Sequence, residues 1–542
     1  MKLLDPRQAA RPFLSLPPFP KRRLADFALA GTDVAALSDA EADALIDLLA
    51  ETRVGGTFWG AQPDLGPDPF VLVKDDVSAL SAELPARPLV WIEDDEERST
   101  RAEIVRRECD PWHMLQGATA LYCQPGDALQ LIAGIAGVPV RPVGFEGPAR
   151  SLDRASVRAL LRKALGPHLY LDPFDASPMS WMQVVELCAG WRRLIDANRS
   201  IAAVYGIARW KRSTTEPLLW DGSLDDRFER PADAIRPGDK VACWKSRTPA
   251  PLLAALTKAN ATLVEVEDGF IRSAGLGANC VPPQSIVVDD LGAHFDGRSA
   301  SRLEQILQNG NFPAELLTRA RNLRRSINAL GISKYDVGQE HLERRSTKAH
   351  VLVPGQVEDD RAVLSTPGHP LTNLEMLRRV RESRPDAHII YKPHPDVEAG
   401  HRKGTIPDQV ALGIADEVVR APSISSWIDL VDEVHVNSSL AGFEALLRDT
   451  KVTTHGVPFY GGWGLTEDLG PVPERRTARR TVDELVAASL IVYPRYVDPM
   501  TNLPCSPEVL ITRLSTAPSP KFSLVSFARR LQGQLMRRLA MR

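Results

Sequence analysis

The sequence predicts an α/β fold built on doubly wound parallel sheets, and two observations carry that prediction. Short apolar segments alternate with amphipathic segments of helical period along much of the chain. Successive apolar segments are separated by a helix-length segment, as the crossover between two parallel strands requires. The composition agrees, because 44 % of the 542 residues are hydrophobic and 25 % are charged, which excludes wholesale disorder. At about 100–200 residues per domain, this length predicts three or four domains.

The first strand–helix–strand unit lies in residues 240–268. KVACW (240–244) predicts a strand, PAPLLAALTKAN (249–260) predicts a helix with a proline near its first turn, and ATLVEV (261–266) predicts a second strand. The second strand ends in Glu267-Asp268-Gly269, so we expect two acids at its carboxyl end.

Two further units follow in the second half of the chain. Their strand, helix and strand are HVLVPG (350–355), TNLEMLRRVRES (372–383) and HIIYKPHP (388–395), and then DEVHVNSS (432–439), LAGFEALLRD (440–449) and KVTTHG (451–456). The blocks 200–345 and 347–516 therefore predict two Rossmann-like halves with ligand in the cleft between them. This is the layout of a GT-B glycosyltransferase.

A weak internal repeat relates the N-terminal part of the chain to the second block. Residues 110–144 resemble residues 425–456 in order and length. Matching positions are Trp112 and Trp427, Cys123 and Ser438, and Asp172 and Asp498. The first copy has lost the polar residues of the second, so we interpret 56–200 as a degenerate GT-B half-module with a structural role. An unrelated α/β domain is the alternative.

These features divide the chain into consecutive segments. They are an N-terminal segment (1–55), the degenerate half-module (56–200), an acceptor-side Rossmann-like domain (201–346), a sugar-nucleotide-binding Rossmann-like domain (347–516) and a C-terminal tail (517–542). From Ser515 onward there are six basic residues and no acidic one, and apolar residues recur on one helical face. Such a basic amphipathic helix suits an anionic membrane surface. Packing of the helix on its own domain is the alternative.

Several classes of function and location are disfavoured. A net charge of −3 excludes a globally basic nucleic-acid binder, so no nucleic-acid partner is expected. The six cysteines form no C-x-x-C pair, and neither a zinc site nor a disulfide framework is indicated. The N-terminus lacks the apolar core of a signal peptide, and no apolar stretch reaches the length of a membrane span. We therefore expect a cytoplasmic protein.

Polar residues at strand ends are the candidate ligand contacts. Asn437-Ser438-Ser439 closes a strand just before a helix, where hydroxyls and backbone N–H groups favour a phosphate. Glu444, within that helix, is placed to accept hydrogen bonds from ribose hydroxyls. A simple helix N-cap is the alternative, because serine and asparagine are favoured at caps regardless of ligand.

Two basic candidates lie in other loops. Lys392 and His394, in Lys392-Pro393-His394-Pro395, end a strand, and either cation there can neutralise a departing phosphate. Arg272, in the glycine-rich loop 269–277, suits a carboxylate or phosphate through its planar fork. A structural histidine is the competing interpretation of His394.

Carboxylates form two clusters at the ends of strands from opposing halves. Glu267 and Asp268 belong to the first half, and Glu358-Asp359-Asp360 belongs to the second. Across a cleft such a pair can divide roles, one acid as nucleophile and the other as general acid or base. Loop acids are also commonly just solvated, so the pairing by itself is only suggestive.

Taken together, these segments resemble the capsule β-Kdo transferases of the KpsC/KpsS-type capsular polysaccharide biosynthesis family, in particular their C-terminal module. The matching segments are YGIARWKR (205–212), VEDGFIRSAGLG (266–277), SIVVDDLGAHFD (285–296), ISKYDVG (332–338), VLVPGQVEDD (351–360), IIYKPHPDVEAGHRKG (389–404), VHVNSSLAGFEALL (434–447) and VPFYGGWGLT (457–466). They run in family order over about 200–510, which is more specific than any single motif.

The resemblance implies roles for the candidate residues. It implies a GT-B fold that transfers Kdo, an acidic eight-carbon sugar, from CMP-Kdo with retention, giving a β linkage. Asp360 matches the nucleophile of a Q-x-x-x-D motif that begins at Gln356, and Glu267 matches the general acid/base. His394 matches the contact to the donor phosphate, and the remaining matches, at the CMP-binding strand–helix junction, are Ser438, Ser439 and Glu444. The family implies no metal and no cofactor beyond the donor substrate.

One departure from the family pattern leaves two functions open. The long capsule enzymes carry two complete modules, and only the second is complete here. The leading hypothesis is a β-Kdo transferase that acts on a lipid-linked or Kdo-terminated acceptor at the inner face of the cytoplasmic membrane, with capsule assembly or export proteins as possible partners. The alternative is a catalytically silent CMP-binding scaffold of a capsule assembly complex.

Overall fold

The computed structural model describes residues 12–23, 27–30, 37–75, 87–92, 103–106, 108–166, 168–272, 281–333, 340–366, 371–400 and 402–516. The expectations for the tail 517–542 and for residues 273–277 of the glycine-rich loop lie outside this part of the chain. The chain divides into two compact units, the first comprising Met1–Ser200 and Leu219–Asp225 and the second Ile201–Leu218 and Asp226–Arg542.

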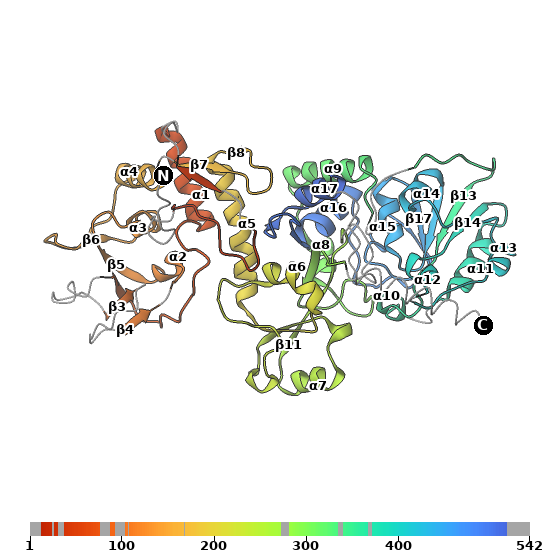
Figure 1. Ribbon diagram of the computed structural model, residues 1–542, viewed down its shortest axis with the longest axis horizontal. Coiled ribbons are helices and arrows are strands. Elements are labelled where there is room, and N and C mark those ends of the chain that lie inside the picture. The colour runs from red at the N-terminus through yellow and green to blue at the C-terminus, as the bar shows by residue number, and fades with distance from the viewer. Residues whose placement is uncertain are drawn as a thin grey trace. The chain divides into compact units, whose positions relative to one another are not determined.

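The first unit contains a parallel sheet with strand order β4-β3-β2-β5-β6. Its strands are β2 (Phe70–Lys74), β3 (Arg87–Ile92), β4 (Glu103–Arg106), β5 (Ala118–Cys123) and β6 (Val140–Pro142). A small antiparallel sheet joins β1 (Ala28–Ala30), β7 (His168–Leu171) and β8 (Pro178–Met179). The helices are α1 (Asp39–Thr52), α2 (Pro111–Met114), α3 (Leu129–Ala136), α4 (Arg154–Leu165) and α5 (Trp181–Arg199), labelled in Figure 1.

The second unit contains a mixed sheet with strand order β20-β19-β12-β11-β10-β9. Its strands are β9 (Ile201–Tyr205), β10 (Lys240–Cys243), β11 (Thr262–Asp268), β12 (Ser285–Asp289), β19 (Arg495–Val497) and β20 (Pro504–Cys505). β9, β10 and β11 are parallel, whereas β12 and β19 join by antiparallel pairing. The sequence places residues 495–505 with the second half, but they complete the sheet of the first half. β19 pairs with β12, which lies more than 200 residues earlier, and no local pattern in the sequence indicates this pairing.

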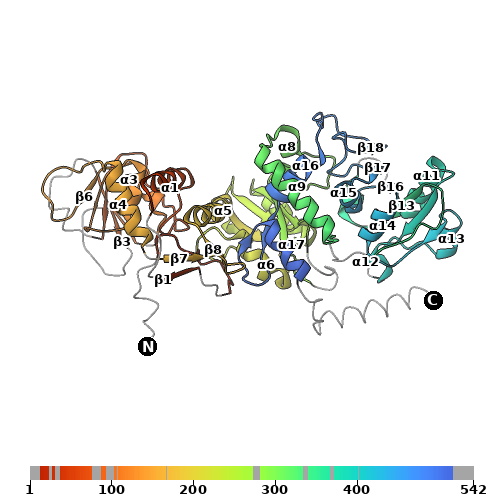
Figure 2. The same cartoon turned by 90° about the horizontal axis from the view of Figure 1, so that it is seen from above.

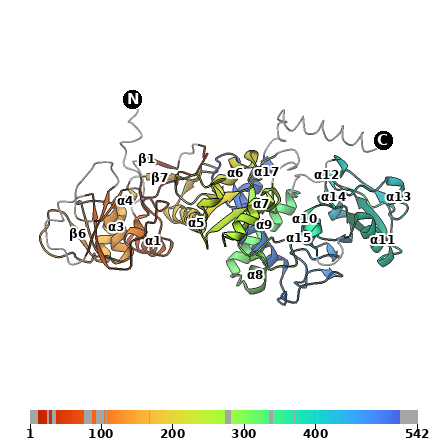
Figure 3. The ribbon, with the colours of Figure 1, turned by 90° about the horizontal axis from the view of Figure 1, so that it is seen from below.

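A wholly parallel sheet forms the other half of the second unit, with order β15-β14-β13-β16-β17-β18. Its strands are β13 (His350–Pro354), β14 (His388–Lys392), β15 (Glu417–Val418), β16 (Glu433–Val436), β17 (Lys451–Thr454) and β18 (Glu467–Asp468). Figure 2 and Figure 3 show α14 (Ile424–Leu430) and α15 (Leu440–Leu447) on one face of this sheet and α11 (Asn373–Ser383) and α13 (Asp408–Leu412) on the other. Strands covered on both faces read as continuous apolar segments, which is why the sequence locates them well.

The remaining helices complete the second unit. They are α6 (Arg209–Leu219), α7 (Ala250–Lys258), α8 (Arg302–Asn309), α9 (Ala314–Ala329), α10 (Arg361–Leu364), α12 (Pro395–Glu398), α16 (Val482–Val486) and α17 (Pro507–Thr516). The predicted α/β fold class with parallel sheets is confirmed, while the GT-B arrangement stays a prediction. No helix in the described part of the chain is long and apolar enough to cross a membrane.

The topology agrees with the internal repeat. The order β4-β3-β2-β5-β6 of the first unit is repeated by β15-β14-β13-β16-β17 of the second, strand for strand in chain order. The loops after Asp172 and Asp498 also match, since each aspartate carbonyl accepts the backbone N–H four residues on at 2.8 Å. Those residues, Ala176 and Asn502, both have left-handed backbones, with φ of 62° and 59°. The shared strand order is the general one of doubly wound sheets, so the assignment of 56–200 as a degenerate half-module stays a prediction.

Candidate active site

The loops that follow β13, β14 and β16 gather the predicted donor contacts. β13 pairs in parallel with both β14 and β16, so the carboxyl ends of the three strands lie next to one another at one edge of the sheet. Gln356, His394 and Ser438 each lie within two residues of one of these strand ends. The fold of the sheet therefore brings together three residues that are far apart along the chain.

Gln356 joins two of these loops directly. Its side-chain oxygen accepts the backbone N–H groups of Asn437 at 3.2 Å and Ser438 at 3.1 Å. Its amide nitrogen lies 3.3 Å from the Ser438 hydroxyl oxygen. A single glutamine thus fixes the loop in front of α15, and its contact with a donor stays a prediction.

The junction itself combines a helix cap with buried polar groups. Ser439 caps α15, its hydroxyl accepting the N–H of Ala441 at 3.2 Å, as the capping interpretation predicts. Glu444 is buried one turn further along the helix. Asn437 is only 4 % exposed, and its side-chain amide has no hydrogen-bond partner among the described residues. A buried amide of this kind calls for a partner, which a bound nucleotide can supply.

The two basic residues after β14 have defined partners. His394 caps α12 with Nδ1, which accepts the backbone N–H of Asp396 at 3.1 Å. An accepting Nδ1 carries no proton, so the ring proton of the neutral imidazole is on Nε2, where it can be donated. Lys392 is buried and donates to the carbonyls of Arg420 and Pro422, both at 2.8 Å. Its direct contact with a donor stays a prediction.

The three adjacent acids after β13 have defined contacts. Glu358 accepts the N–H of Asn373 at 2.8 Å, at the start of α11. Asp359 and Asp360 share Arg402, at 3.1 Å and 3.7 Å, and their side chains are 44 % and 49 % exposed. Asp360 also caps the short helix α10 by accepting the N–H of Ala362 at 3.0 Å. Of the three acids, Asp360 is thus the one that is both exposed and fixed at a helix start.

Arg361 connects the acids of the two halves, and sequence reasoning missed it. Its guanidinium donates to Glu267 at 2.7 Å and also pairs with Glu265, both on β11 of the other sheet. Arg361 is the first residue of the helix that Asp360 caps. The structure thus brings the Asp360 loop and Glu267 to one place. In the sequence, only the position of Arg361 directly after Asp360 marks this arginine as a candidate.

Glu267 lies inside β11, at its carboxyl end, and its side chain is 17 % exposed. Burial raises the pKa of Glu267 to about 8, with the neighbouring Asp268 and Glu265 adding to the rise and Arg361 and Lys211 opposing it. A carboxyl group that titrates near neutrality can both give and take a proton at physiological pH. This is the property that a general acid/base needs.

Lys211, on α6, is a second residue that sequence reasoning passed over, although it lies in one of the family-like segments. Its ammonium lies 3.2 Å from the centre of the Trp244 ring and 3.3 Å from the Asp268 carboxylate. Burial lowers the pKa of Lys211 to about 8, against the attraction of Asp268. Arg272 is also buried against Asp268, at 3.0 Å, and donates to the carbonyl of Val281 at 2.8 Å. Asp268 therefore holds two cations beside Glu267.

Lys211→Met is expected to raise the pKa of Glu267 further, because it removes a positive charge that favours the Glu267 carboxylate. If Glu267 acts as a base, the alkaline rise in the pH–rate profile moves to higher pH. Lys240→Met is the matched control, because Lys240 pairs at 3.4 Å with Asp290, a carboxylate outside this cluster. An unchanged profile in Lys211→Met contradicts the electrostatic role of Lys211.

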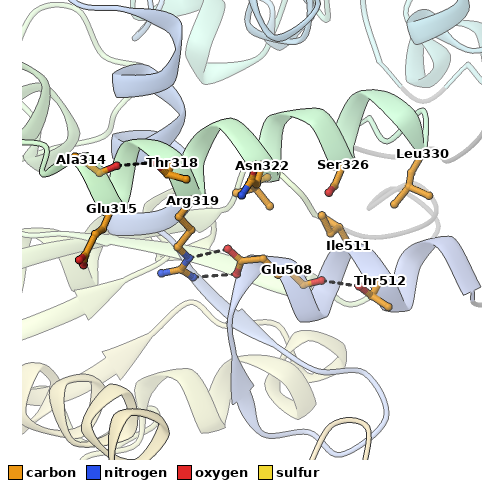
Figure 4. Close-up of a pocket in the computed structure, with 11 residues that line it drawn as sticks. Ala314, Glu315, Thr318, Arg319, Asn322, Ser326, Leu330, Glu508, Ile511 and Thr512 are labelled. Atoms are coloured by element: carbon orange, nitrogen blue, oxygen red, sulfur yellow. Dashed lines mark hydrogen bonds and ion pairs between the residues drawn. The ribbon is translucent and has the colours of Figure 1, made fainter. Parts of the chain in front are cut away.

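A further cavity of the second unit lies away from these residues. A hollow of 670 Å³ separates α9 from α17, and Figure 4 shows its lining with Arg319 paired to Glu508. None of the predicted site residues lines it. The described residues also contain no cluster of three or more histidine, cysteine or acidic side chains able to hold a metal ion.

Comparison with known proteins points to one family. The family described as capsule polysaccharide biosynthesis protein matches residues 239–341 and 332–496. The capsule polysaccharide modification protein LipA of Neisseria meningitidis serogroup A is 35 % identical over 427 residues, covering 74 % of this chain and 60 % of LipA. The lipopolysaccharide-processing protein LpsZ of Rhizobium meliloti is 44 % identical over 244 residues, covering 44 % of this chain and 55 % of LpsZ. The chain thus spans 60 % of the length of LipA and 55 % of the length of LpsZ.

Solved structures with similarity include two from Thermosulfurimonas dismutans KpsC. Its β-Kdo 2,4 transferase is 28 % identical with a TM-score of 0.49, and its β-Kdo 2,7 transferase is 31 % identical with a TM-score of 0.47. In both comparisons the match covers 58 % of this chain and 98 % of the other.

Proposed function

Because this chain belongs to the capsule polysaccharide biosynthesis family, we propose that it is a retaining glycosyltransferase that moves Kdo from CMP-Kdo to a lipid-linked or Kdo-terminated acceptor, forming a β linkage. One observation carries the proposal. Arg361 joins Glu267 of one sheet to the helix that Asp360 caps at the edge of the other. Arg361 therefore links the elements that carry two carboxylates with different environments, and we infer that the sugar is placed between these carboxylates, in the division of roles that a double displacement needs.

The proposed reaction has two steps. The Asp360 carboxylate attacks the anomeric carbon and the bond to the CMP phosphate breaks, so that CMP departs with the bonding electrons. The acceptor hydroxyl then attacks the same carbon while Glu267 takes its proton, and the bond to Asp360 breaks. Two inversions give net retention, as in retaining glycosidases. No metal or further cofactor takes part in this scheme.

The residues after β14 and β16 supply the donor contacts of the scheme. Nε2 of His394 donates to the departing phosphate. The Ser438 hydroxyl and the unpartnered Asn437 amide contact the nucleotide, together with Ser439 and Glu444. Gln356 keeps this junction in place through its two accepted N–H groups. Lys392 holds the loop after β15 through the carbonyls of Arg420 and Pro422, whereas Arg272 is bound to Asp268 beside Glu267 in the other half.

The deciding experiment is release of CMP from CMP-Kdo by the purified chain, with and without a Kdo-terminated acceptor. We expect at most one CMP per protein without acceptor and continued CMP release with it, and the product should carry a β-linked Kdo, read from its NMR spectrum. Binding of CMP with no release and no product would instead support the catalytically silent scaffold.

His394→Ala is expected to lower the rate of transfer on the order of a hundredfold, the usual cost of removing one preorganised donor to a developing charge. The affinity for CMP itself should change much less, because the charge on the phosphate grows as the sugar departs. His341→Ala, at an exposed histidine, is the control. Unchanged turnover in His394→Ala removes this residue from the mechanism.

We place the working protein at the inner face of the cytoplasmic membrane, held there by the basic tail 517–542. Its six positive charges are expected to contribute about 1 kcal/mol each near an anionic surface. Co-sedimentation with anionic vesicles should weaken in high salt, and a chain ending near Ala517 should lose it while keeping activity on a soluble acceptor. Equal sedimentation of both chains contradicts the membrane role.

A further inference from the structure

A small polar cavity lies in the half that carries Glu267. It measures 190 Å³ and is lined by the end of β10, by β11 and by the loop that follows β12. Its polar groups are those of Lys245, Glu265, Asp296 and Ser299. Drug-sized ligands occupy about 300–1,000 Å³, so this cavity has room for a single sugar ring.

Two carboxylates of the cavity are held in place by arginines. Asp296 receives two hydrogen bonds from Arg298, both 2.7 Å long. Burial opposes ionisation of Asp296, but these bonds keep its pKa below the ordinary value. Glu265 pairs with Arg361. An ionised carboxylate that uses part of its capacity on an arginine still has lone pairs with which to accept sugar hydroxyls.

A cation lies at the rim of the same cavity. The Lys245 ammonium is 3.9 Å from the Glu265 carboxylate, and its side chain is 51 % exposed. An exposed, mobile ammonium at this distance can turn to a carboxylate on the ligand without breaking a tight ion pair. The cavity therefore presents acceptors for hydroxyls and one positive group for an acid.

The two arginines also attach the cavity to the proposed catalytic residues. Arg361 contacts Glu265 and Glu267 together, which are two positions apart on the same strand. Arg298 donates to the hydroxyl of Ser365 at 3.2 Å, at the end of the helix whose start Asp360 caps. A sugar in the cavity thus lies beside Glu267, on the side of the first half.

We propose that this cavity binds the terminal sugar of the acceptor, and that the sugar is an acidic one. Its hydroxyls donate to Glu265 and Asp296, its carboxylate pairs with Lys245, and the hydroxyl to be glycosylated faces Glu267. The inference rests on the proposed function, and it adds where the acidic sugar of the acceptor binds and which residues recognise it.

The kinetic test uses Lys245→Gln and Asp296→Asn. Each is expected to raise the KM for a Kdo-terminated acceptor about tenfold, the effect of losing one charged hydrogen bond. The affinity for CMP and the formation of a sugar adduct from CMP-Kdo without acceptor should stay unchanged. Lys258→Gln, at an exposed lysine at the end of α7, is the matched control. An unchanged KM in both variants overturns the proposal. If Asp296→Asn does not fold, the KM of Lys245→Gln alone decides the test.

Direct binding separates the two proposals. The methyl β-glycoside of Kdo, without donor, should give saturation-transfer NMR signals with the full chain, and Lys245→Gln should weaken them. An analogue with its carboxyl group reduced to an alcohol should bind both proteins equally weakly. Equal binding of the acidic glycoside by both proteins overturns the acceptor site alone. A wild-type chain that binds the glycoside but forms no adduct and releases no CMP refutes the proposed transfer and leaves the sugar site standing.

Discussion

Asp360→Asn is expected to abolish sugar transfer while leaving CMP binding intact. An amide cannot act as the nucleophile of a double displacement. The substitution is also structurally mild, because asparagine caps a helix as well as aspartate does, so α10 keeps its start. The proposed nucleotide contacts are elsewhere, at Ser438, Ser439 and Glu444. Intact-protein mass spectrometry after mixing wild-type protein with CMP-Kdo, without acceptor, should show one covalently attached Kdo, located at Asp360 by peptide mapping.

Asp359→Asn is the matched control for Asp360→Asn. The two acids are neighbours, and Asp359 pairs with Arg402 at 3.1 Å without capping α10. It should retain transfer and form the same adduct. An adduct on Asp359 or Glu358 would mean that the nucleophile is misassigned, and wild-type turnover by Asp360→Asn would remove covalent catalysis from this position.

Glu267→Gln is expected to lower the rate of transfer by about 10²–10⁴-fold, the range for loss of a general acid or base. CMP is a good leaving group that needs little protonation, so the first step should persist. The variant should therefore accumulate the Asp360 adduct even when acceptor is present, whereas the wild type discharges it. Rapid mixing followed by mass spectrometry measures this difference. Discharge of the adduct at the wild-type rate excludes Glu267 as the base.

The pH dependence of transfer provides a second measure of Glu267. Because its pKa in the folded protein is about 8, the fraction able to accept a proton rises with pH up to that value, and so should the rate of discharge. The Gln variant should lack this rise. Stability has the opposite sign: folding raises this pKa from 4.5, so the free energy of unfolding falls as pH increases between the two values. Chemical denaturation of both proteins across this range should show the stability of the wild type falling relative to that of the Gln variant.

The sequence predicted the strands of the parallel sheet well, and the reason is physical. β13 and β14 are buried on both faces, so their sequences are continuously apolar over 351–353 and 389–391. β19 was placed with the wrong sheet because its pairing with β12 depends on a contact between distant parts of the chain. The pattern of residues in a short stretch of sequence carries no information about a partner strand so far away.

The candidate site residues show the same contrast between local patterns, which the sequence reveals, and contacts between distant elements, which it does not. Ser439 and Asp360 are recognisable because a helix follows each of them directly, and their capping roles are local. Arg361 and Lys211 were missed because their importance lies in ion pairs with Glu267 and Asp268 of another element. An arginine after an acid, or a lysine in a helix, is ordinarily a solvated surface residue, and only the folded chain shows that these two are not.

The return of the chain to its first sheet through β19 and β20 constrains how this protein can be divided or exchanged. A chain cut near residue 346 leaves β12 with an open edge, which is a template for aggregation. A chimera with a relative must therefore join at two points, before β13 and again before α16, so that residues 482–516 travel with the first half, because Asp483 of α16 pairs with Arg321 of α9 at 3.0 Å. Any movement of one half against the other has to bend the chain at both crossings and break the contacts that Arg361 and Arg298 make between the halves.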